Sequence, residues 1–154
     1  MYGVSRIDVC ENTTLITYNK IPVDLHIIQE VFQRIAQLGV NIDMISQTFP
    51  VGGKMNISFT CPDDDMVKVL TTTRELGAAH PQLSALVSGS NNKLRLYGEE
   101  MRTEPGVFAK VLAVLAELGV EPLQITTSEV EISLLVTSAG FEETRDALRA
   151  AFSL

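Results

Sequence analysis

VFQRIAQLGV at Val31–Val40 and VLAVLAELGV at Val111–Val120 are two copies of one pattern, and their repetition decides the predicted fold. In each copy, apolar residues recur at the spacing of an amphipathic helix, and a glycine follows the last of them. A glycine in this place ends a helix, because it adopts the left-handed conformation without steric cost. The two glycines, Gly39 and Gly119, lie 80 positions apart (119 − 39). The chain is therefore predicted to contain the same structural unit twice.

The segments around each repeated helix predict the rest of the unit. One strand-like run precedes the helix, and two more follow the glycine as a hairpin before a second helix begins. With a closing strand, this order is that of the split βαβ, ferredoxin-like unit, so we predict an α+β protein of two βαββαβ modules. The expected strands are Thr14–Asn19, Asn41–Phe49, Lys54–Cys61, Leu83–Ser88, Lys93–Gly98, Pro122–Ser128 and Val130–Thr137, and the expected later helices are Asp64–Leu76 and Glu142–Phe152.

The second copy has no closing strand of its own, because its last helix runs to Leu154. At the other end of the chain, Tyr2–Cys10 (YGVSRIDVC) alternates like a strand and has no place in the first copy. We expect this N-terminal strand to complete the second module, with Gly89–Asn92 (GSNN) as a linker. The predicted domains are residues 13–88 for the first module, and residues 1–12 plus 89–154 for the discontinuous second module.

Composition argues against several classes of protein. The formal net charge of -7 disfavours a nucleic-acid partner, because such binding depends on clustered Lys and Arg. No run approaches the roughly 18 apolar residues of a membrane-spanning helix, so no membrane partner is expected. Cys10 and Cys61 have no CxxC spacing, and each stands in an apolar, strand-like run. Two buried thiols are therefore predicted, which fits a reducing cytoplasm.

No arrangement of catalytic or cofactor-binding residues stands out. The phosphate-binding patterns GxxxxGK[ST] and GxGxxG do not occur. His26 and His80 lie far apart without Cys or Glu at ligand spacing, and Asp63–Asp65 stands where a helix start favours capping over cation binding. Thr127–Glu129 puts a hydroxyl beside a carboxylate, but a tight turn explains it better than a nucleophile without a nearby histidine. We predict no catalytic residue, no metal site and no cofactor.

Two stretches resemble a known family. GVNIDMISQ at Gly39–Gln47 resembles the first ACT module of aspartokinases, and Gly98–Val136 resembles the second, with Met-Arg, Pro-Gly, Thr-Ser-Glu and Ile-Ser in order. The likeness covers essentially the whole chain, including the N-terminal strand that completes the second module in this family. It implies a regulatory region that forms a homodimer by laying sheets edge to edge. It also implies binding of a small amino-acid effector, of the lysine or threonine class, at module interfaces.

The resemblance implies a regulatory protein of amino-acid biosynthesis rather than an enzyme. The chain would act as the C-terminal allosteric region or the regulatory subunit of an aspartokinase. Kinase activity is expected only if the chain is part of, or partnered with, a kinase catalytic chain. The alternative is a structural dimerisation module that has kept the dimer surface and lost effector binding. Stabilisation by a free amino acid would separate the two, because a ligand of the folded state raises the melting temperature.

Pro105-Gly106 marks the predicted effector site. A glycine at the start of a helix lets a ligand approach backbone N–H groups, and such a helix terminus suits a carboxylate. A plain strand-to-helix turn is the alternative explanation of the same residues. In the first copy this loop reads Val23–His26, without the glycine or the proline.

The resemblance implies that an effector lies between this loop and the segment after the first helix of a facing module. There the first copy has Asn41-Ile42, whereas the second has Glu121-Pro122, and a proline has no backbone N–H to offer. The two surviving half-sites are therefore expected to combine. The predicted effector-binding residues are Thr103, Glu104, Pro105, Gly106, Val107, Phe108, Asn41, Ile42 and Gln47.

Overall fold

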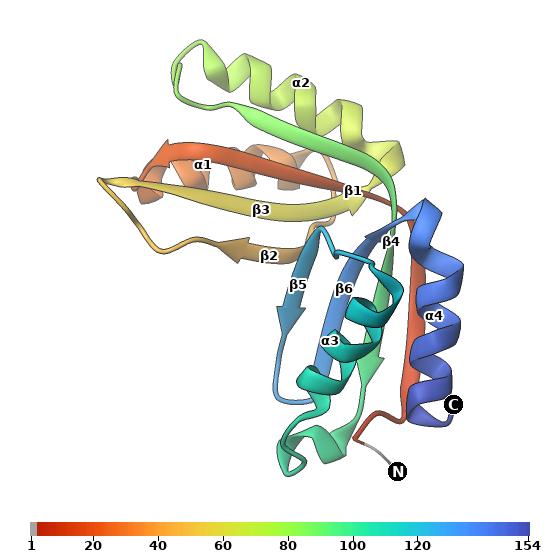
Figure 1. Ribbon diagram of the computed structural model, residues 1–154. Coiled ribbons are helices and arrows are strands. Elements are labelled where there is room, and N and C mark those ends of the chain that lie inside the picture. The colour runs from red at the N-terminus through yellow and green to blue at the C-terminus, as the bar shows by residue number, and fades with distance from the viewer. Residues whose placement is uncertain (1–2) are drawn as a thin grey trace. The chain divides into compact units, whose positions relative to one another are not determined.

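The computed structural model describes residues 3–154, which form two compact units (Figure 1). The first unit is Asn12–Gly89, and the second consists of the described residues up to Glu11 together with Ser90–Leu154. Two long strands, β1 (Arg6–Pro22) and β4 (Ala85–Tyr97), contribute residues to both units. The second unit is thus discontinuous in sequence.

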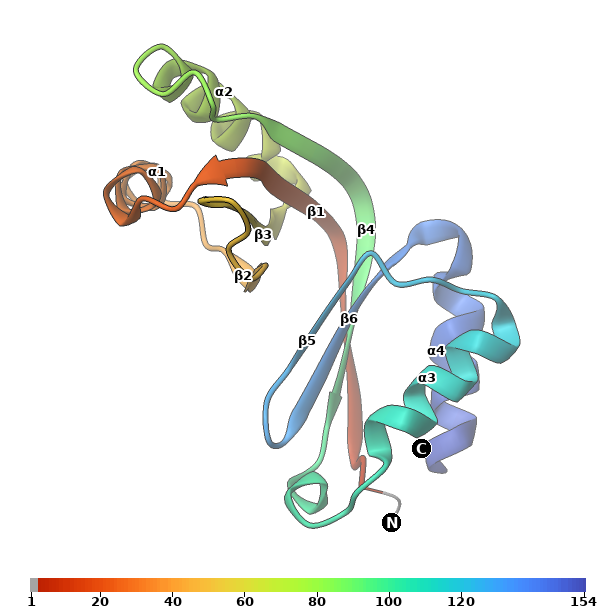
Figure 2. The ribbon, with the colours of Figure 1, turned by 60° about the vertical axis from the view of Figure 1, so that its left-hand side comes forward.

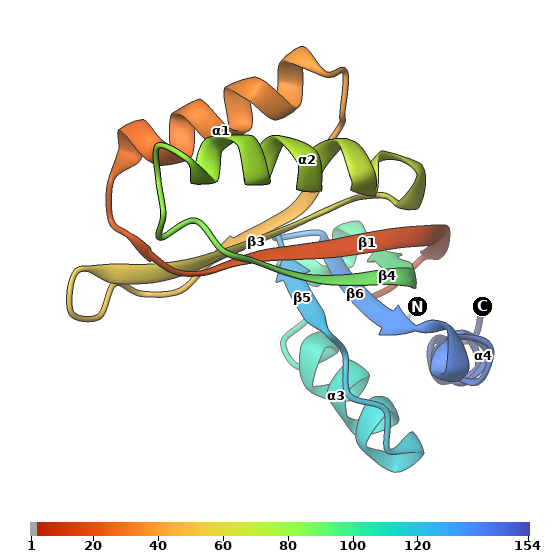
Figure 3. The same cartoon turned by 90° about the horizontal axis from the view of Figure 1, so that it is seen from above.

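The first unit packs two helices on a sheet with the strand order β2 (Asp43–Gln47), β3 (Lys54–Pro62), β1 and β4. Strand β3 is antiparallel to both of its neighbours. Figure 3 shows α1 (Leu25–Gln37) and α2 (Met66–Gly77) side by side on one face of these strands. The apolar side chains between helices and sheet form the core, which includes Ile16, Tyr18, Val31, Ile35, Ile57, Phe59, Val69 and Leu76.

The second unit repeats this arrangement with the strand order β1, β4, β6 (Glu131–Thr137) and β5 (Gln124–Thr127). Helices α3 (Val107–Leu118) and α4 (Ser138–Phe152) lie on the same side of these strands (Figure 2). Their apolar faces and the strands share one core, which includes Val4, Leu94, Leu96, Val111, Leu115, Leu134, Phe141 and Leu148.

The prediction of an α+β protein with two ferredoxin-like modules is confirmed. The repeated glycines act as expected, because Gly39 follows the end of α1 with φ +73° and Gly119 caps α3 with φ +66°. Two short 3-10 helices complete the elements, η1 (Asp63–Asp65) before α2 and η2 (Glu99–Arg102) before α3. No helix among residues 3–154 is long and apolar enough to cross a membrane.

The two units divide between Gly89 and Ser90, within the predicted linker Gly89–Asn92, but this segment is a strand and not the expected loop. These residues lie within β4, where Asn91 and Asn92 are buried and paired with Thr137 and Val136 of β6. Composition suggested a turn, but the antiparallel ladder supplies these backbone groups with hydrogen-bond partners in an extended strand. Ser90 adopts a left-handed conformation, with φ 58°, and the strand continues through it.

The predicted break between the N-terminal strand and Thr14–Asn19 is also wrong. Strand β1 runs continuously from Arg6 to Pro22, and Asn12 takes the left-handed conformation, with φ 54°, inside it. Within the second unit, Ser5 N donates a hydrogen bond to Tyr97 O at 2.8 Å, and Val4 is buried in the core. Tyr2, with which the predicted strand began, lies outside the described residues.

Three local predictions also need correction. Cys61 is buried as expected, but Cys10 is exposed, because it lies on a β1 segment whose neighbours face solvent. The helix expected from Asp64 begins instead with the 3-10 turn η1, and Asp63 Oδ1 accepts a hydrogen bond from Thr14 Oγ1 at 2.5 Å. Helix α4 begins at Ser138, four residues before the predicted start at Glu142.

Candidate functional site

Gly106 begins α3 in a conformation that glycine tolerates best. Its φ is +92°, in the left-handed region, and it forms the N-cap of the helix. Because glycine has no side chain, no side-chain cap hydrogen bond is made to the first N–H groups of α3. A Cβ atom built at Gly106 would meet no atom within 4 Å. The start of α3 therefore faces open space.

That space is an open pocket of about 850 Å³ within the second unit. One wall is the loop from η2 into α3, and the opposite wall is the end of β5, the turn after it and β6. The side chains that line it are both apolar and charged. They are Met101, Arg102, Glu104, Gly106, Val107, Phe108, Ile125, Thr127, Ser128, Glu129 and Ile132.

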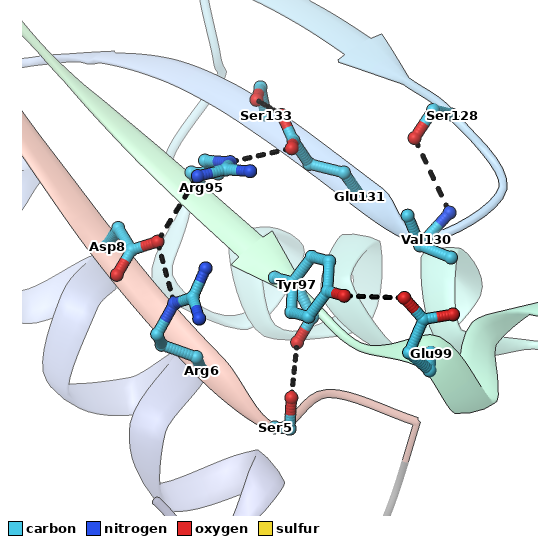
Figure 4. Close-up of polar contacts among 10 residues, drawn as sticks. All are labelled: Ser5, Arg6, Asp8, Arg95, Tyr97, Glu99, Ser128, Val130, Glu131 and Ser133. Atoms are coloured by element: carbon cyan, nitrogen blue, oxygen red, sulfur yellow. Dashed lines mark hydrogen bonds and ion pairs between the residues drawn. The ribbon is translucent and has the colours of Figure 1, made fainter.

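Backbone hydrogen bonds hold the two walls in place. The turn between β5 and β6 is closed by Ser128 N, which donates to Glu131 O at 2.8 Å, and Ser128 Oγ accepts from Val130 N at 3.4 Å (Figure 4). The same turn is tied to the opposite wall, because Gly98 N donates to Val130 O at 2.9 Å. Glu129 is thereby carried at the tip of the turn.

An ion pair joins the two walls. Arg102 Nη1, from η2, is paired with Glu129 Oε2, from the turn. Arg102 has a second carboxylate partner, because its Nε lies 3.3 Å from Glu99 Oε2. Arg102, Glu99 and Glu129 are all exposed, with side-chain exposures of 50%, 64% and 77%. The pair is a solvent-accessible contact and not a buried one.

Tyr97, at the end of β4, positions Glu99. Its hydroxyl donates to Glu99 Oε1 at 2.5 Å (Figure 4). This hydrogen bond, followed by the one from Arg102, lowers the pKa of Glu99, and the same bond raises the pKa of Tyr97. The carboxylates of Glu99 and Glu129 raise the pKa of Arg102. The charges around Arg102 therefore reinforce its ionised state.

The predicted site residues fall into two groups. Of those in the loop, Glu104, Gly106, Val107 and Phe108 line the pocket, whereas Thr103 and Pro105 are exposed and do not. Asn41, Ile42 and Gln47 belong to the first unit, after α1 and at the end of β2. Asn41 and Gln47 are exposed and Ile42 is half-buried.

Sequence reasoning missed the residues of the pocket outside this loop. Their types carried a signal, because Met-Arg and Thr-Ser-Glu are among the patterns that gave the resemblance. A tight turn is present as expected, although Thr127 ends β5 and the turn runs from Ser128 to Glu131; this turn also borders the pocket. The missed residues are Met101, Arg102, Ile125, Thr127, Ser128, Glu129 and Ile132.

The corresponding loop of the first unit is built differently. Asp24 is the N-cap of α1, and its Oδ1 accepts a hydrogen bond from His26 N at 2.9 Å. The helix start is thus capped by the protein itself. Nothing in the described residues 3–154 forms a group of three His, Cys, Asp or Glu side chains that could hold a metal ion.

Comparisons with known proteins agree with this architecture. Residues 94–152 match the model of the ACT domain family. An aspartokinase of Mycolicibacterium smegmatis is 34% identical over 127 residues, which make up 81% of this chain and 30% of that protein. An aspartokinase of Corynebacterium glutamicum is 30% identical over the same length, again 30% of that protein. The chain thus spans less than a third of the length of these relatives.

Solved structures match over nearly the whole chain. A crystal structure of aspartokinase alpha and beta subunits has a TM-score of 0.88 and 28% identity, and covers 98% of this chain and 99% of that one. The ligand-free regulatory subunit of aspartate kinase from Thermus thermophilus has a TM-score of 0.85 and 26% identity, with 97% and 99% covered.

Proposed function

Because this chain is homologous to the regulatory ACT region of aspartokinases, we propose that it senses a free amino acid and controls a kinase catalytic chain. The proposed effector belongs to the lysine or threonine class, and the proposed location is the cytoplasm. The modules that do this are proposed to be residues 13–88, and residues 1–12 plus 89–154.

One observation carries this proposal: α3 begins without a side-chain cap at an open pocket. The first N–H groups of a helix bear partial positive charge, so they attract the carboxylate of an amino acid. Gly106 leaves room for that approach, since an added Cβ would have no neighbour within 4 Å. The volume of about 850 Å³ is within the usual range of small-molecule sites.

The second half of the site is proposed to come from a facing module. Asn41 and Gln47 are exposed and carry amide oxygens that accept hydrogen bonds from an ammonium group. Ile42 would contribute its backbone groups and an apolar contact. A facing module is available in a homodimer, whose proposed contacts are the edge strands β2 and β5.

Calorimetric titration of the chain with the common amino acids tests this function, and a thermal-shift screen supports it independently. Binding of at least one of them, with a rise in melting temperature, is the expected result. Molar mass in solution is measured in the same samples. A dimer that binds no amino acid would support the alternative, a dimerisation module without a sensor function. A monomer at micromolar concentration would contradict the proposed homodimer.

A further inference from the structure

The first unit has a cavity of its own, at the turn between β2 and β3. Its volume is about 390 Å³, and the residues that line it come from β1, β2, β3 and this turn rather than from α1 or α2. Figures 1 and 3 show that the turn projects beyond both helices of the unit. The lining includes Lys20, Thr48, Phe49, Lys54 and Asn56. This cavity shares no residue with the pocket at the start of α3.

A β-bulge in β1 brings Lys20 to the cavity. The register of β1 on β3 shifts between Tyr18 and Ile21, so two residues of β1 stand opposite Asn56 alone. Lys20 is one of the two, and its φ of 52° is in the left-handed region, which is uncommon for residues other than glycine. Lys20 N donates to Asn56 Oδ1 at 2.8 Å, and Asn56 N donates to Thr48 Oγ1 at 2.9 Å. The bulge is thus fixed by side chains that line the cavity.

The two lysines at this cavity have no acidic partner. Within residues 3–154, neither Lys20 nor Lys54 forms an ion pair, and the lining of the cavity includes no Asp or Glu. The chain as a whole carries a net charge of -7, so most of its surface repels anions, and this cavity is a local exception. Two ammonium groups at one cavity suit the several negative charges of a phosphate chain.

An exposed aromatic ring lies at the same cavity. Phe49 is 85% exposed, which is the highest value for a large hydrophobic side chain in the part of the chain that the structure describes. An exposed aromatic face stacks well on a nucleobase, because both are planar and apolar. Asn56 adds an amide NH2 group that has no partner among the described residues and can donate to a ligand. The volume of the cavity is within the range of small-molecule sites.

We infer that this cavity binds a nucleoside phosphate, with the phosphates at Lys20 and Lys54 and the base stacked on Phe49. Both parts of the ligand are needed, because exposed charges or one exposed ring alone hold a small molecule weakly. A nucleic-acid strand fits less well, since its further phosphates would meet an acidic surface. The inference does not depend on the proposed amino-acid sensor function, because the two sites have no residue in common.

Calorimetric titration of the whole chain with ATP, adenosine and inorganic triphosphate, without divalent cations, tests the site. ATP should bind about tenfold more tightly than either of its parts, and its affinity should fall as salt is added. Phe49→Ala should weaken ATP binding by about fivefold or more and leave triphosphate binding unchanged. Lys20→Gln and Lys54→Gln should each weaken the binding of ATP and of triphosphate by about threefold to fivefold.

Matched control variants come from α2 of the same unit. Arg74 is an exposed cation that forms no ion pair within residues 3–154, and Val67 is an apolar side chain that is 66% exposed. Arg74→Gln and Val67→Ala should bind ATP with the affinity of the wild type. Gly106→Ala should do so as well, because it changes only the pocket of the second unit.

Four results would overturn the inference, whatever the titrations with amino acids show. One is a wild-type chain that binds no ATP at millimolar concentration. Another is an Arg74→Gln variant that loses as much affinity as Lys54→Gln, since ATP would then respond to surface charge in general. Loss of ATP binding in Gly106→Ala would place the nucleotide in the second unit. Unchanged ATP affinity in Phe49→Ala would mean that the cavity selects phosphate without a nucleoside.

Discussion

The two units begin their first helices in opposite ways, although both helices come from the same repeat. At α1, Asp24 caps the helix with its own carboxylate, which accepts from His26 N at 2.9 Å. At α3, Gly106 adopts φ +92° and has no side chain to offer. Both helices are followed by a left-handed glycine, at Gly39 and Gly119. The two copies thus end their first helices in the same way but begin them differently.

The two helix starts differ in which backbone groups are left unsatisfied. A capped helix start is satisfied internally, so it contributes to stability and leaves less for a ligand. An uncapped start that opens into a pocket leaves N–H groups to water or to an anion. At this position the first unit is capped by its own side chain, whereas the second unit is not.

Removal of residues 3–10 should have the largest effect, because it should destabilise the second unit far more than the first. The second unit would lose Val4 from its core and the pairing of β1 with β4, which together should cost about 2–4 kcal/mol. Hydrogen exchange should show roughly a hundredfold loss of protection at Ile132–Val136 and a smaller loss at Ile57–Cys61. Val9→Ala is the control, because that side chain is 42% exposed. Equal protection at Ile132–Val136 before and after deletion would contradict a role for this strand in the second unit.

Replacement of Gly106 by alanine should sharpen the contrast between the helix starts. Gly106→Ala places a methyl group in the pocket and should weaken amino-acid binding by roughly tenfold or more, measured by calorimetry. Gly119→Ala controls for backbone strain, because Gly119 also has positive φ and an unobstructed Cβ position. Each variant should lose about 1–2 kcal/mol of stability. His26→Ala should bind the amino acid with the affinity of the wild type. Equal affinities of Gly106→Ala and Gly119→Ala would contradict an effector site at the start of α3.

Removal of the cap in the first unit is expected to have a moderate effect. Asp24→Ala should reduce the free energy of unfolding by about 1 kcal/mol, since His26 N loses its acceptor. Asp24→Asn should retain most of that stability, because its side-chain oxygen can accept the same bond. Glu104→Ala, in the loop before α3, should change stability by less than about 0.5 kcal/mol. Urea unfolding of the three variants measures these differences; a costly Glu104→Ala would show that α3 is capped after all.

The smallest predicted effect concerns alkaline pH and the first unit. Burial, followed by the nearby carboxylates of Asp65 and Asp63, raises the pKa of the Cys61 thiol from its ordinary 9.0 to about 11. The folded state therefore favours the neutral thiol, and this contribution is complete below pH 9 and lost as pH rises towards 11. The unfolding free energy of wild type should fall more steeply across this range than that of Cys61→Ala. Parallel curves would show that the thiol does not titrate with unfolding.

Much of the fold could be predicted from the sequence, because the spacing of apolar residues indicates which side chains are buried. The spacing of Val31, Ile35 and Val111, Leu115 predicted helices whose inward faces are indeed buried. The continuity of β1 and β4 was not predictable in this way, because Asn12 and Ser90 are turn-forming residues by type. Their conformation depends on pairing with strands that are distant in the sequence, which the local residue types do not indicate.

Only part of the candidate site was predictable, for a related reason. Gly106 could be found because glycine before a helix has a local physical meaning. Arg102 and Glu129 are separated by 27 positions, and their contact depends on how the hairpin returns beside η2. A surface arginine and a surface glutamate have many local explanations, so only the assembled hairpin reveals the pair.

The discontinuity of the second unit has a consequence for folding order. Ser5 and Tyr97 are joined by a hydrogen bond across 92 positions, and the whole first unit lies between them in the chain. Closure of a flexible segment of that length carries a large entropic cost, which falls once the segment has become a compact body. During synthesis the first unit is complete before β6 has been made, so we expect the first unit to fold early. Its folding would bring the chain on either side of it close together, which lowers the entropic cost of pairing Ser5 with Tyr97. The segment that ends at Glu11 is then made before the first unit, yet it is among the last to find its partners.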